Sequence, residues 1–337
     1  MRRSHRSRVC RRSRRRLRTN DALSAGCYVR RVQIIVLGAG AIGSLIGAKL
    51  SAQSEVILVG RAAHARAINE RGLVIHGVES RTVELRAFEQ VESIGSNALV
   101  ILTTKVPATA AALSSIARLV REDTTILCLQ NGLGAESVAR DAVRGRCVVL
   151  RGITQLGAIF DQPGVINYMA NGYTVVEQHE RAQHIAMLFN GAGIETRISS
   201  DIRRDVWHKL ILNCVVNPIT TMIGSKVGAI ADSQLDELKQ LVINECLAVA
   251  RAEGLKFDLD FQREIRDLYA ASHNVVSMRQ DLSRGRPTEI DYMNGAVAAV
   301  GARHGIACPV NAALAQIIRA METRSLFPEK MLQPELS

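Results

Sequence analysis

The residues best suited to chemistry lie in one apolar segment, "DVWHKLILNCVVNPITTMIG", which spans residues 205–224. Lys209, Asn213 and Asn217 recur there at intervals of four residues, about one turn of an α-helix, so we expect them on one stripe roughly 12 Å long. A partly desolvated ammonium has a lowered pKa and can donate a proton near neutral pH, and carboxamides bind oxygen atoms without adding charge. The alternative is an amphipathic helix whose polar side faces water.

A second candidate site is the segment "GAGAIG", which follows the apolar run "VQIIVL" and precedes a stretch of helical periodicity. In this context the spacing G-x-G-x-x-G predicts a dinucleotide site. Gly38 permits a tight turn, Gly40 lets the backbone approach a pyrophosphate, and Gly43 allows the helix to pack closely on the strand. The predicted cofactor-binding turn consists of Gly38, Ala39, Gly40, Ala41, Ile42 and Gly43.

The end of the next apolar run, "EVILVGR", indicates which dinucleotide binds. A carboxylate at that position grips the ribose 2′-hydroxyl of NAD, whereas an arginine accommodates the 2′-phosphate of NADP. Here the run ends in Gly60 and Arg61, which favours NADP. The alternative is that Arg61 is an ordinary exposed loop residue.

The elements that must position these residues change character near residue 200. Before it, short apolar runs such as 97–105 and 124–132 alternate with helical stretches, which predicts an α/β fold with a Rossmann-type, doubly wound parallel sheet. Residues 148–177 predict hairpin turns at "DQPGV" and "MANGY". Beyond residue 200, helical periodicity predicts a second, all-α domain with helices at 202–223, 233–253, 260–283, 288–304 and 310–322.

We therefore expect four regions: a basic extension at 1–31, an NADP-binding domain at 32–199, a helical substrate and catalytic domain at 200–326, and a tail at 327–337. The formal charge of +11 belongs to the first region, because residues 1–31 contain 12 Arg and one acid, whereas the remainder has 31 basic and 31 acidic residues. Three explanations for the extension stay open: an upstream start site, which we favour, a transit peptide, or a nucleic-acid-binding arm.

The cysteines and histidines exclude several other classes of protein. Seven cysteines form no C-x-x-C pair and their number is odd, so neither a disulfide framework nor a metal site is expected. A reducing compartment, the cytoplasm, fits this composition. No segment predicts a membrane span, and nucleic acid is not expected as a partner of the neutral body of the chain. A homodimer is compatible with the sequence, which does not fix the oligomeric state.

Seven motifs in order carry a resemblance to a known family: "VLGAGAIG", "TTKV", "LQNGLG", "IRRDVWHKLILNCVVNPIT", "NVVSMRQDL", "TEIDYMNG" and "HGIACPVN". From Val32 to about Met321 the chain resembles the ketopantoate reductases (2-dehydropantoate 2-reductases). The resemblance implies NADPH-dependent reduction of a small 2-oxo acid, ketopantoate, to (R)-pantoate, in the biosynthesis of pantothenate and coenzyme A.

The resemblance also implies roles for individual residues. Lys209 would be the general acid that protonates the keto oxygen, and Glu289 would orient the substrate hydroxyl, Lys209 or the cofactor ribose. The implied substrate-binding residues are Asn131, Asn213, Asn217, Asn274 and Ser277. The implied cofactor-binding residues beyond the glycine turn and Arg61 are Lys105, Asn131, Ala158 and Glu289.

Two other functions stay open on the sequence. One is a paralogous NADPH-dependent reductase of another branched 2-oxo acid. The other is a non-catalytic NADP-binding protein whose Arg-rich extension binds nucleic acid.

Overall fold

The computed structural model describes residues 32–326, and the side chains among them up to residue 324. The predictions for the basic extension 1–31, for the tail 327–337, and for Cys10 and Cys27 therefore fall outside the described residues.

An eight-stranded sheet forms the core of the first domain, in the order β12-β11-β8-β7-β6-β1-β2-β5. Every neighbouring pair in it is parallel except β11 and β8. The prediction of a Rossmann-type, doubly wound sheet is confirmed. The strands are β1 (Gln33–Leu37), β2 (Glu55–Val59), β5 (Arg86–Phe88), β6 (Leu99–Leu102), β7 (Thr125–Cys128), β8 (Val148–Thr154), β11 (Thr174–Glu177) and β12 (Thr196–Ser199).

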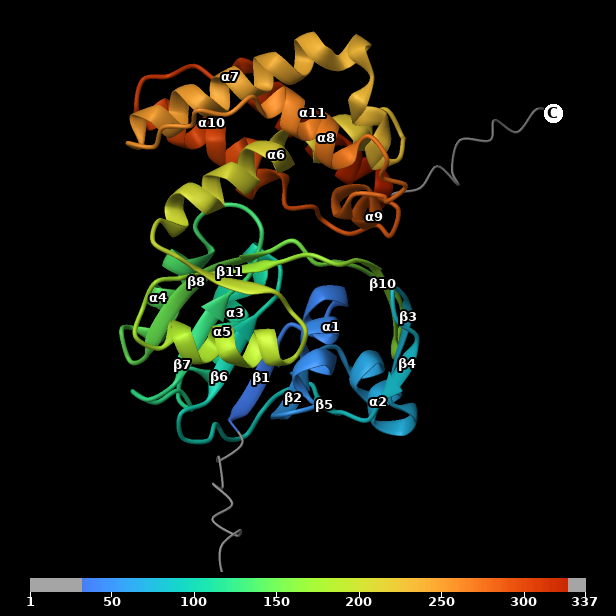
Figure 1. Cartoon of the computed structure of the whole chain (residues 1–337), viewed down its shortest axis with the longest axis vertical. Helices are drawn as coiled ribbons and strands as arrows, with labels where there is room; N and C mark the ends of the chain where they lie inside the picture. The colour runs from blue at the N-terminus through green and yellow to red at the C-terminus, as the bar shows by residue number, and fades with distance from the viewer. Residues whose placement is uncertain (1–31, 327–337) are drawn as a thin grey trace, which may run out of the picture. The chain divides into compact units, whose positions relative to one another are not determined.

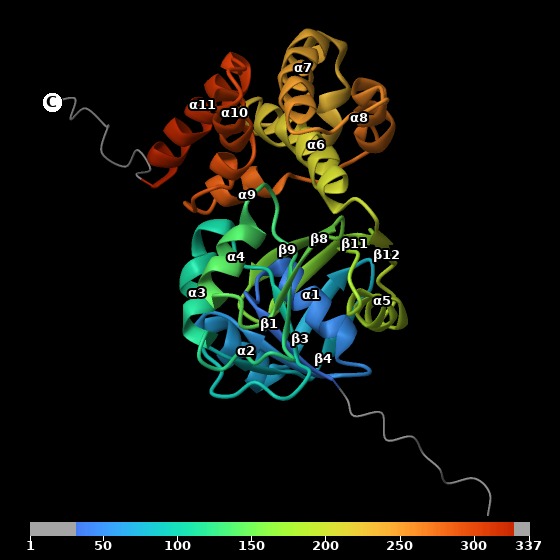
Figure 2. The same ribbon diagram turned by 90° about the vertical axis from the view of Figure 1, so that its left-hand side faces the viewer.

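Helices cover both faces of this sheet because successive side chains of a strand point to opposite faces. In β1, Ile34 and Val36 pack in one apolar core, and Ile35 and Leu37 pack in the other. The first core includes α1 (Ala41–Leu50) and α5 (Ala182–Gly191), and the second includes α3 (Thr109–Ile116) and α4 (Ala135–Val143), which lie on opposite sides of the sheet in Figure 2. Helix α2 (Ala62–Arg71) follows β2.

A second, four-stranded sheet was not predicted: β3 (Leu73–Gly77), β4 (Arg81–Val83), β9 (Gly157–Gln162) and β10 (Val165–Ala170), in the order β4-β3-β10-β9. The hairpin predicted at "DQPGV" is confirmed by the antiparallel pair β9–β10. The hairpin predicted at "MANGY" is wrong, since β10 pairs with β3 and β9 whereas β11 pairs with β8 and β12. Residues 171–173 instead carry the chain from one sheet to the other.

The second domain consists of α6 (Ile202–Met222), α7 (Asp236–Ala252), α8 (Phe261–Tyr269), α9 (Ser277–Leu282), α10 (Asn294–Arg303) and α11 (Pro309–Leu326), with short 3₁₀ turns η2 (Val227–Ala231), η3 (Ser233–Leu235) and η4 (Ile290–Tyr292). Figure 1 shows the other helices gathered around α6. The helix predicted at 202–223 is present, and that at 310–322 lies within α11.

The single helix predicted at 260–283 is wrong, because an irregular segment separates α8 from α9. Its carbonyls bond to η2 instead of continuing a helix: the Val227 amide donates to the Asn274 carbonyl and the Gly228 amide donates to the Ser272 carbonyl, each at 2.9 Å. The stretch predicted as a helix at 288–304 begins with η4, so its α-helix starts only at Asn294.

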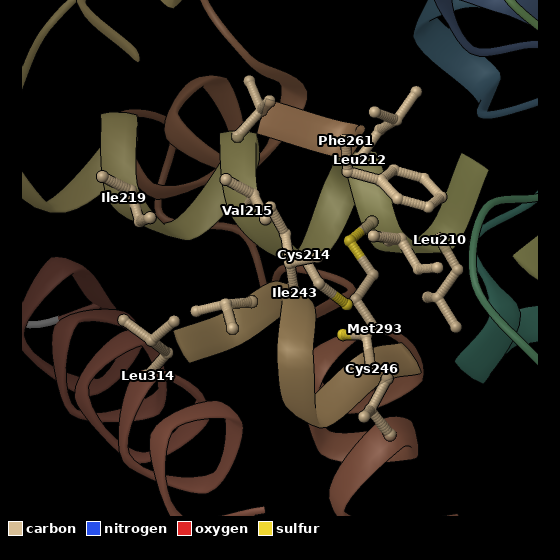
Figure 3. Packing of buried hydrophobic residues seen from close by; sticks show 14 of the residues in the cluster. Leu210, Leu212, Cys214, Val215, Ile219, Ile243, Cys246, Phe261, Met293 and Leu314 are labelled. Atoms are coloured by element: carbon tan, nitrogen blue, oxygen red, sulfur yellow. The ribbon is translucent and has the colours of Figure 1, made fainter. Parts of the chain in front are cut away.

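Helix α6 lies in the core of its domain, where Cys214, Val215 and Ile219 pack among other apolar side chains (Figure 3). Pro218 lies inside this helix and has no N–H to donate to the carbonyl of Cys214, four residues earlier. The side-chain amide of Asn294 donates to that carbonyl at 2.9 Å, and a second N–H of the same amide donates to the Asn311 side chain at 2.9 Å. The fully buried Asn294 thereby replaces the hydrogen bond that proline removes.

This replacement yields a prediction for stability. Asn294→Ala leaves the Cys214 carbonyl buried without a donor, so the free energy of unfolding should fall by about 1–3 kcal/mol. Urea denaturation followed by circular dichroism measures the change. Asn244→Ala, on the exposed side of α7, is the control and should change stability by less than about 0.5 kcal/mol. Equal losses in both variants would contradict the role of Asn294.

Candidate active site

The glycine turn between β1 and α1 has the geometry that its spacing predicts. Gly38 has φ +108°, and its amide and that of Ala39 both donate to the Val59 carbonyl of β2, at 3.0 and 2.8 Å. A Cβ at Gly38 would lie 2.5 Å from the Thr104 amide nitrogen, and one at Gly43 would lie 2.5 Å from the Gly38 carbonyl oxygen. Glycine is therefore required at both positions by the surrounding backbone.

Gly40 is different, because the space beside it is open. A Cβ there would meet no neighbour closer than 4.0 Å, and the residue is exposed. Gly40 is the N-cap of α1, whose first turn has neither a side-chain cap nor an acid. The amides at the start of α1, which no described residue accepts from, and the positive end of the helix dipole suit a pyrophosphate. These residues fit a dinucleotide.

Arg61 is the residue that precedes α2 at the carboxyl end of β2, where it is exposed. Two arginines from the segment between α9 and η4 extend the positive charge: Arg284 donates to the Phe160 carbonyl at 2.6 Å, and the Arg286 guanidinium lies 5.9 Å from the centre of the Phe160 ring. Burial, with the neighbouring charges of Arg61 and Arg284, lowers the pKa of Arg286. Three mutually repelling cations gain stability when they share an anion, so the cluster suits a phosphate.

Lys209 is buried on α6, with 9% of its surface exposed. Its ammonium donates to the Thr154 carbonyl at the end of β8, at 2.6 Å, and so links the helical domain to the sheet. Burial and the charge of Arg151 lower the pKa of Lys209 to about 8, while the charge of Glu289 opposes them. The side chain therefore remains protonated at neutral pH but gives up its proton far more readily than an exposed lysine.

Glu289 precedes η4 and faces the ends of β6 and β7. Its two carboxylate oxygens accept from the Val106 amide at 3.4 Å and from the Asn131 side chain at 3.5 Å. Burial raises the pKa of Glu289, and the nearby charge of Lys105 opposes that rise. The structure thus brings together Lys209, Glu289 and Asn131, which lie far apart in the sequence.

Lys105 follows β6 and binds the segment between α9 and η4. Its ammonium forms an ion pair with Asp281 at 2.8 Å and donates to the Pro287 carbonyl at 2.5 Å. Close by, the Leu133 amide donates to the Tyr292 carbonyl at 3.0 Å. Residues 281–292 of the helical domain, which we call the strap, are therefore tied to the nucleotide domain at several points.

The remaining predicted residues differ in how closely they join this cluster. Asn213 is half-buried one turn after Lys209, and within residues 32–324 its side chain has no hydrogen-bond partner. Asn217 is buried and donates weakly to the Met293 sulfur at 3.5 Å. Ala158 lies in β9, the edge strand of the smaller sheet.

Asn274 and Ser277 are not joined to the cluster by any hydrogen bond of the described residues. Asn274 lies in the irregular segment before α9, and its carbonyl accepts from Val227. Ser277 is the exposed first residue of α9, the helix that carries Asp281. Their predicted contact with a substrate carboxylate stays a prediction.

Sequence reasoning missed three parts of this site. Arg151 had a usable signal, a charged residue within the buried strand sequence "VVLRGIT", because a buried charge requires partners. The Thr154 group that binds Lys209 is a backbone carbonyl, which leaves no trace in the side-chain pattern. Arg286 has no distinguishing signal in the sequence "LSRGRPTE", and only the folded strap places it near Arg61.

The described residues contain no group of three or more His, Cys, Asp or Glu arranged to hold a metal ion. Cys128, Cys147, Cys214, Cys246 and Cys308 are free thiols. Among the described helices, none is long and apolar enough to cross a membrane.

A glycine turn for a dinucleotide and a buried lysine from a second, helical domain define the class: a two-domain, dinucleotide-dependent oxidoreductase. Residues 34–181 match the family model described as ketopantoate reductase PanE/ApbA, and residues 201–322 match the model of its C-terminal domain. The chain belongs to this ketopantoate reductase family.

Individual relatives agree with the family match. The chain is 36% identical over 300 residues to a 2-dehydropantoate 2-reductase of Pyrococcus horikoshii, covering 87% of this chain and 98% of the relative. It is 32% identical over 304 residues to one of Archaeoglobus fulgidus, covering 88% and 99%.

Solved structures share the same fold. A PanE/ApbA family ketopantoate reductase from Ralstonia eutropha is 29% identical with a TM-score of 0.80, covering 87% of this chain and 99% of that one. D-mandelate dehydrogenase, in a ternary structure with NADH and anilino(oxo)acetate, is 26% identical with a TM-score of 0.81 and the same coverage.

The open space at Gly40 yields a prediction for cofactor binding. Gly40→Val should fold with near-normal stability, yet weaken dinucleotide binding about tenfold or more, because the new side chain occupies the approach of the pyrophosphate. Calorimetric titration with NADPH and a thermal melt measure the two effects. Gly43→Val is the contrasting variant and should lose stability, because its side chain collides with the Gly38 carbonyl. Unchanged NADPH affinity in Gly40→Val would contradict the assignment.

Proposed function

We propose that this protein is an NADPH-dependent 2-dehydropantoate 2-reductase, which reduces ketopantoate to (R)-pantoate on the route to pantothenate and coenzyme A. Its family membership and the names of its relatives support this reaction. The observation that carries the mechanism is Lys209, a buried ammonium held at the end of the sheet that bears the glycine turn.

When bound, NADPH supplies the hydride, and the protein supplies orientation and a proton. Lys209 donates that proton to the keto oxygen as negative charge develops there. Because the carbonyl of Thr154 already accepts one of its three N–H bonds, the ammonium is held in one orientation. A pKa near 8 matches this donor to neutral conditions.

Glu289 and the carboxamides orient the substrate around Lys209. Glu289 is held by Asn131 and the Val106 amide, and in our proposal it accepts from the substrate hydroxyl while balancing the charge of Lys209. Asn213, whose side chain binds no residue between 32 and 324, offers a carboxamide on the same stripe of α6, and Asn217 continues that stripe. Asn274 and Ser277 complete the proposed set at the substrate carboxylate.

In our proposal, the cofactor lies across the carboxyl ends of β1, β2 and β6. The amides at the start of α1 take the pyrophosphate, Arg61 takes the 2′-phosphate, and Lys105 and Asn131 flank the nicotinamide ribose. Ala158 presents backbone from an edge strand. NADP is favoured over NAD because the end of β2 carries a guanidinium where a carboxylate would bind an unphosphorylated ribose.

The central test concerns the proton donor. Lys209→Met should lower kcat by about a hundredfold or more, while leaving the affinity for NADPH nearly unchanged, since only the transition state requires the proton. In the unmodified enzyme, kcat/KM should fall as pH rises above about 8, because only the protonated lysine can donate. Steady-state assays of NADPH consumption with ketopantoate measure both effects.

Lys226→Met, an exposed lysine of the same domain, is the matched control and should retain wild-type turnover. Loss of NADPH affinity equal to the loss of turnover in Lys209→Met would argue against a proton donor. Wild-type protein that consumes NADPH with other 2-oxo acids but not with ketopantoate would identify a paralogous reductase.

A second test concerns the choice of cofactor. Arg61→Asp should reduce the preference for NADPH over NADH by about tenfold to a hundredfold, because a charged partner of the 2′-phosphate is replaced by a repelling carboxylate. The ratio of kcat/KM for the two cofactors measures the change. Arg66→Asp, an exposed position further along α2, makes the same charge change and should leave the ratio nearly unaltered. Similar effects in both variants would mean that the cofactor responds to the total charge of this surface and not to a contact with Arg61.

Location and assembly complete the proposal. A reducing compartment, the cytoplasm, suits a protein whose described cysteines are all free thiols. The reaction requires a small-molecule substrate and no nucleic acid, and a homodimer is the assembly we propose.

A further inference from the structure

Arg151 is a buried cation that takes no part in the proposed contacts with cofactor and substrate. It lies in the middle of β8, three residues before the carbonyl that binds Lys209, and only 3% of its surface is exposed. A buried guanidinium is costly unless its N–H groups are satisfied, so its partners indicate its role.

Those partners are mainly the backbone of the turn that carries Asn131. One terminal nitrogen of Arg151 donates to the carbonyls of Cys128 and Gly152, at 3.1 and 2.8 Å. The other donates to the carbonyls of Gln130 and Gly132, at 2.8 and 3.0 Å. The two residues that flank Asn131 are therefore fixed by the same side chain.

Among the described residues, the Asn131 side chain binds Glu289 and not the Arg151 guanidinium. With the flanking carbonyls turned toward Arg151, the Asn131 side chain reaches Glu289, at 3.5 Å. Gly132, which follows it, has φ +78°, and a Cβ there would collide with the Tyr292 carbonyl of the strap. The shape of the turn is thus set from both sides.

The charge of Arg151 also acts on the catalytic cluster. It is partly balanced by Glu136 of α4, whose carboxylate lies 3.4 Å from Nε, and by the charges of Glu177 on β11 and Glu289. Arg151 and Glu289 are the charged groups that act on Lys209, with opposite signs. A fixed cation favours the neutral amine and so eases loss of the proton.

We propose that Arg151 is a positioning residue with two functions: it shapes the Asn131 turn and it places a permanent positive charge beside Lys209. The inference rests on the proposed function of the enzyme. Both roles of Arg151 matter to the reaction only if Lys209 donates a proton to a substrate that Asn131 helps to hold. Hydrogen bonds and charge are separable by substitution: lysine keeps the charge but cannot reach four carbonyls, whereas methionine removes both.

The experiment compares Arg151→Met, Arg151→Lys and the wild type. Arg151→Met should raise the pKa of Lys209, so the alkaline fall in kcat/KM moves to higher pH and the variant keeps a larger fraction of its maximal rate at pH 9. Arg151→Lys should keep the wild-type pH profile. Both variants should raise KM for ketopantoate by about tenfold or more, because the Asn131 turn loses its fixed shape.

A titration that needs no turnover separates this inference from the proposed function. In protein labelled with 13C at Cε of lysine, the resonance that disappears in Lys209→Met reports the midpoint of Lys209 directly, without substrate. A higher midpoint in Arg151→Met than in the wild type supports the inference even if ketopantoate is not reduced. An unchanged midpoint overturns the electrostatic function.

Arg140→Met is the matched control, since it removes an exposed arginine of α4 that pairs with Glu177 at 3.7 Å. It should change neither the Lys209 midpoint nor KM. If Arg151→Met does not fold, Arg151→Lys still decides the positioning function, because a wild-type KM in that variant overturns it.

Discussion

The hydrogen bond from Lys209 to the Thr154 carbonyl is the interaction on which the rest of the site depends. It spans the two domains and joins the functional stripe of α6 to the end of a strand of the nucleotide sheet. An ammonium removed from water requires such an acceptor, and the acceptor is a backbone atom whose position is set by pairing of β8 with both of its neighbours. The pairing of strands in the sheet thus determines where the ammonium of the proposed proton donor lies.

Much of the fold could be predicted because it follows local patterns. Alternating apolar strands and helices identified the doubly wound sheet, and four-residue spacing identified α6. The smaller sheet could not be foreseen as a whole, since the pair that joins its two hairpins links segments about 90 residues apart, Val74 with Val165. The irregular segment before α9 was missed because its backbone is satisfied by η2, a contact between segments with no shared pattern.

The residues of the candidate site likewise fall into those that local sequence patterns predict and those that depend on contacts between distant segments. Glycine spacing and the end of β2 have local causes, so the geometry of the glycine turn and the place of Arg61 after β2 could be predicted directly from the sequence, while their contacts with a cofactor stay predictions. The family resemblance predicted that Lys209, Glu289 and Asn131 belong to one site. The strap explains why Glu289 lies there, because the ion pair between Lys105 and Asp281 holds the strap against the nucleotide domain. The charge of Arg151 within an apolar strand was visible in the sequence, but the backbone carbonyls that it binds were not, because side-chain patterns do not record such contacts.

The order of strands in the large sheet has a consequence for how the molecule reaches its working state. The central strand β1 pairs with β6, more than 60 residues later, and β8 is linked to β6 through β7 and to β12 through β11. Local contacts let the helices of the second domain form quickly, whereas pairings between distant segments close slowly. The bond between Lys209 and the Thr154 carbonyl joins the two domains, so the proposed proton donor takes its place only once both the sheet and the helical domain have folded.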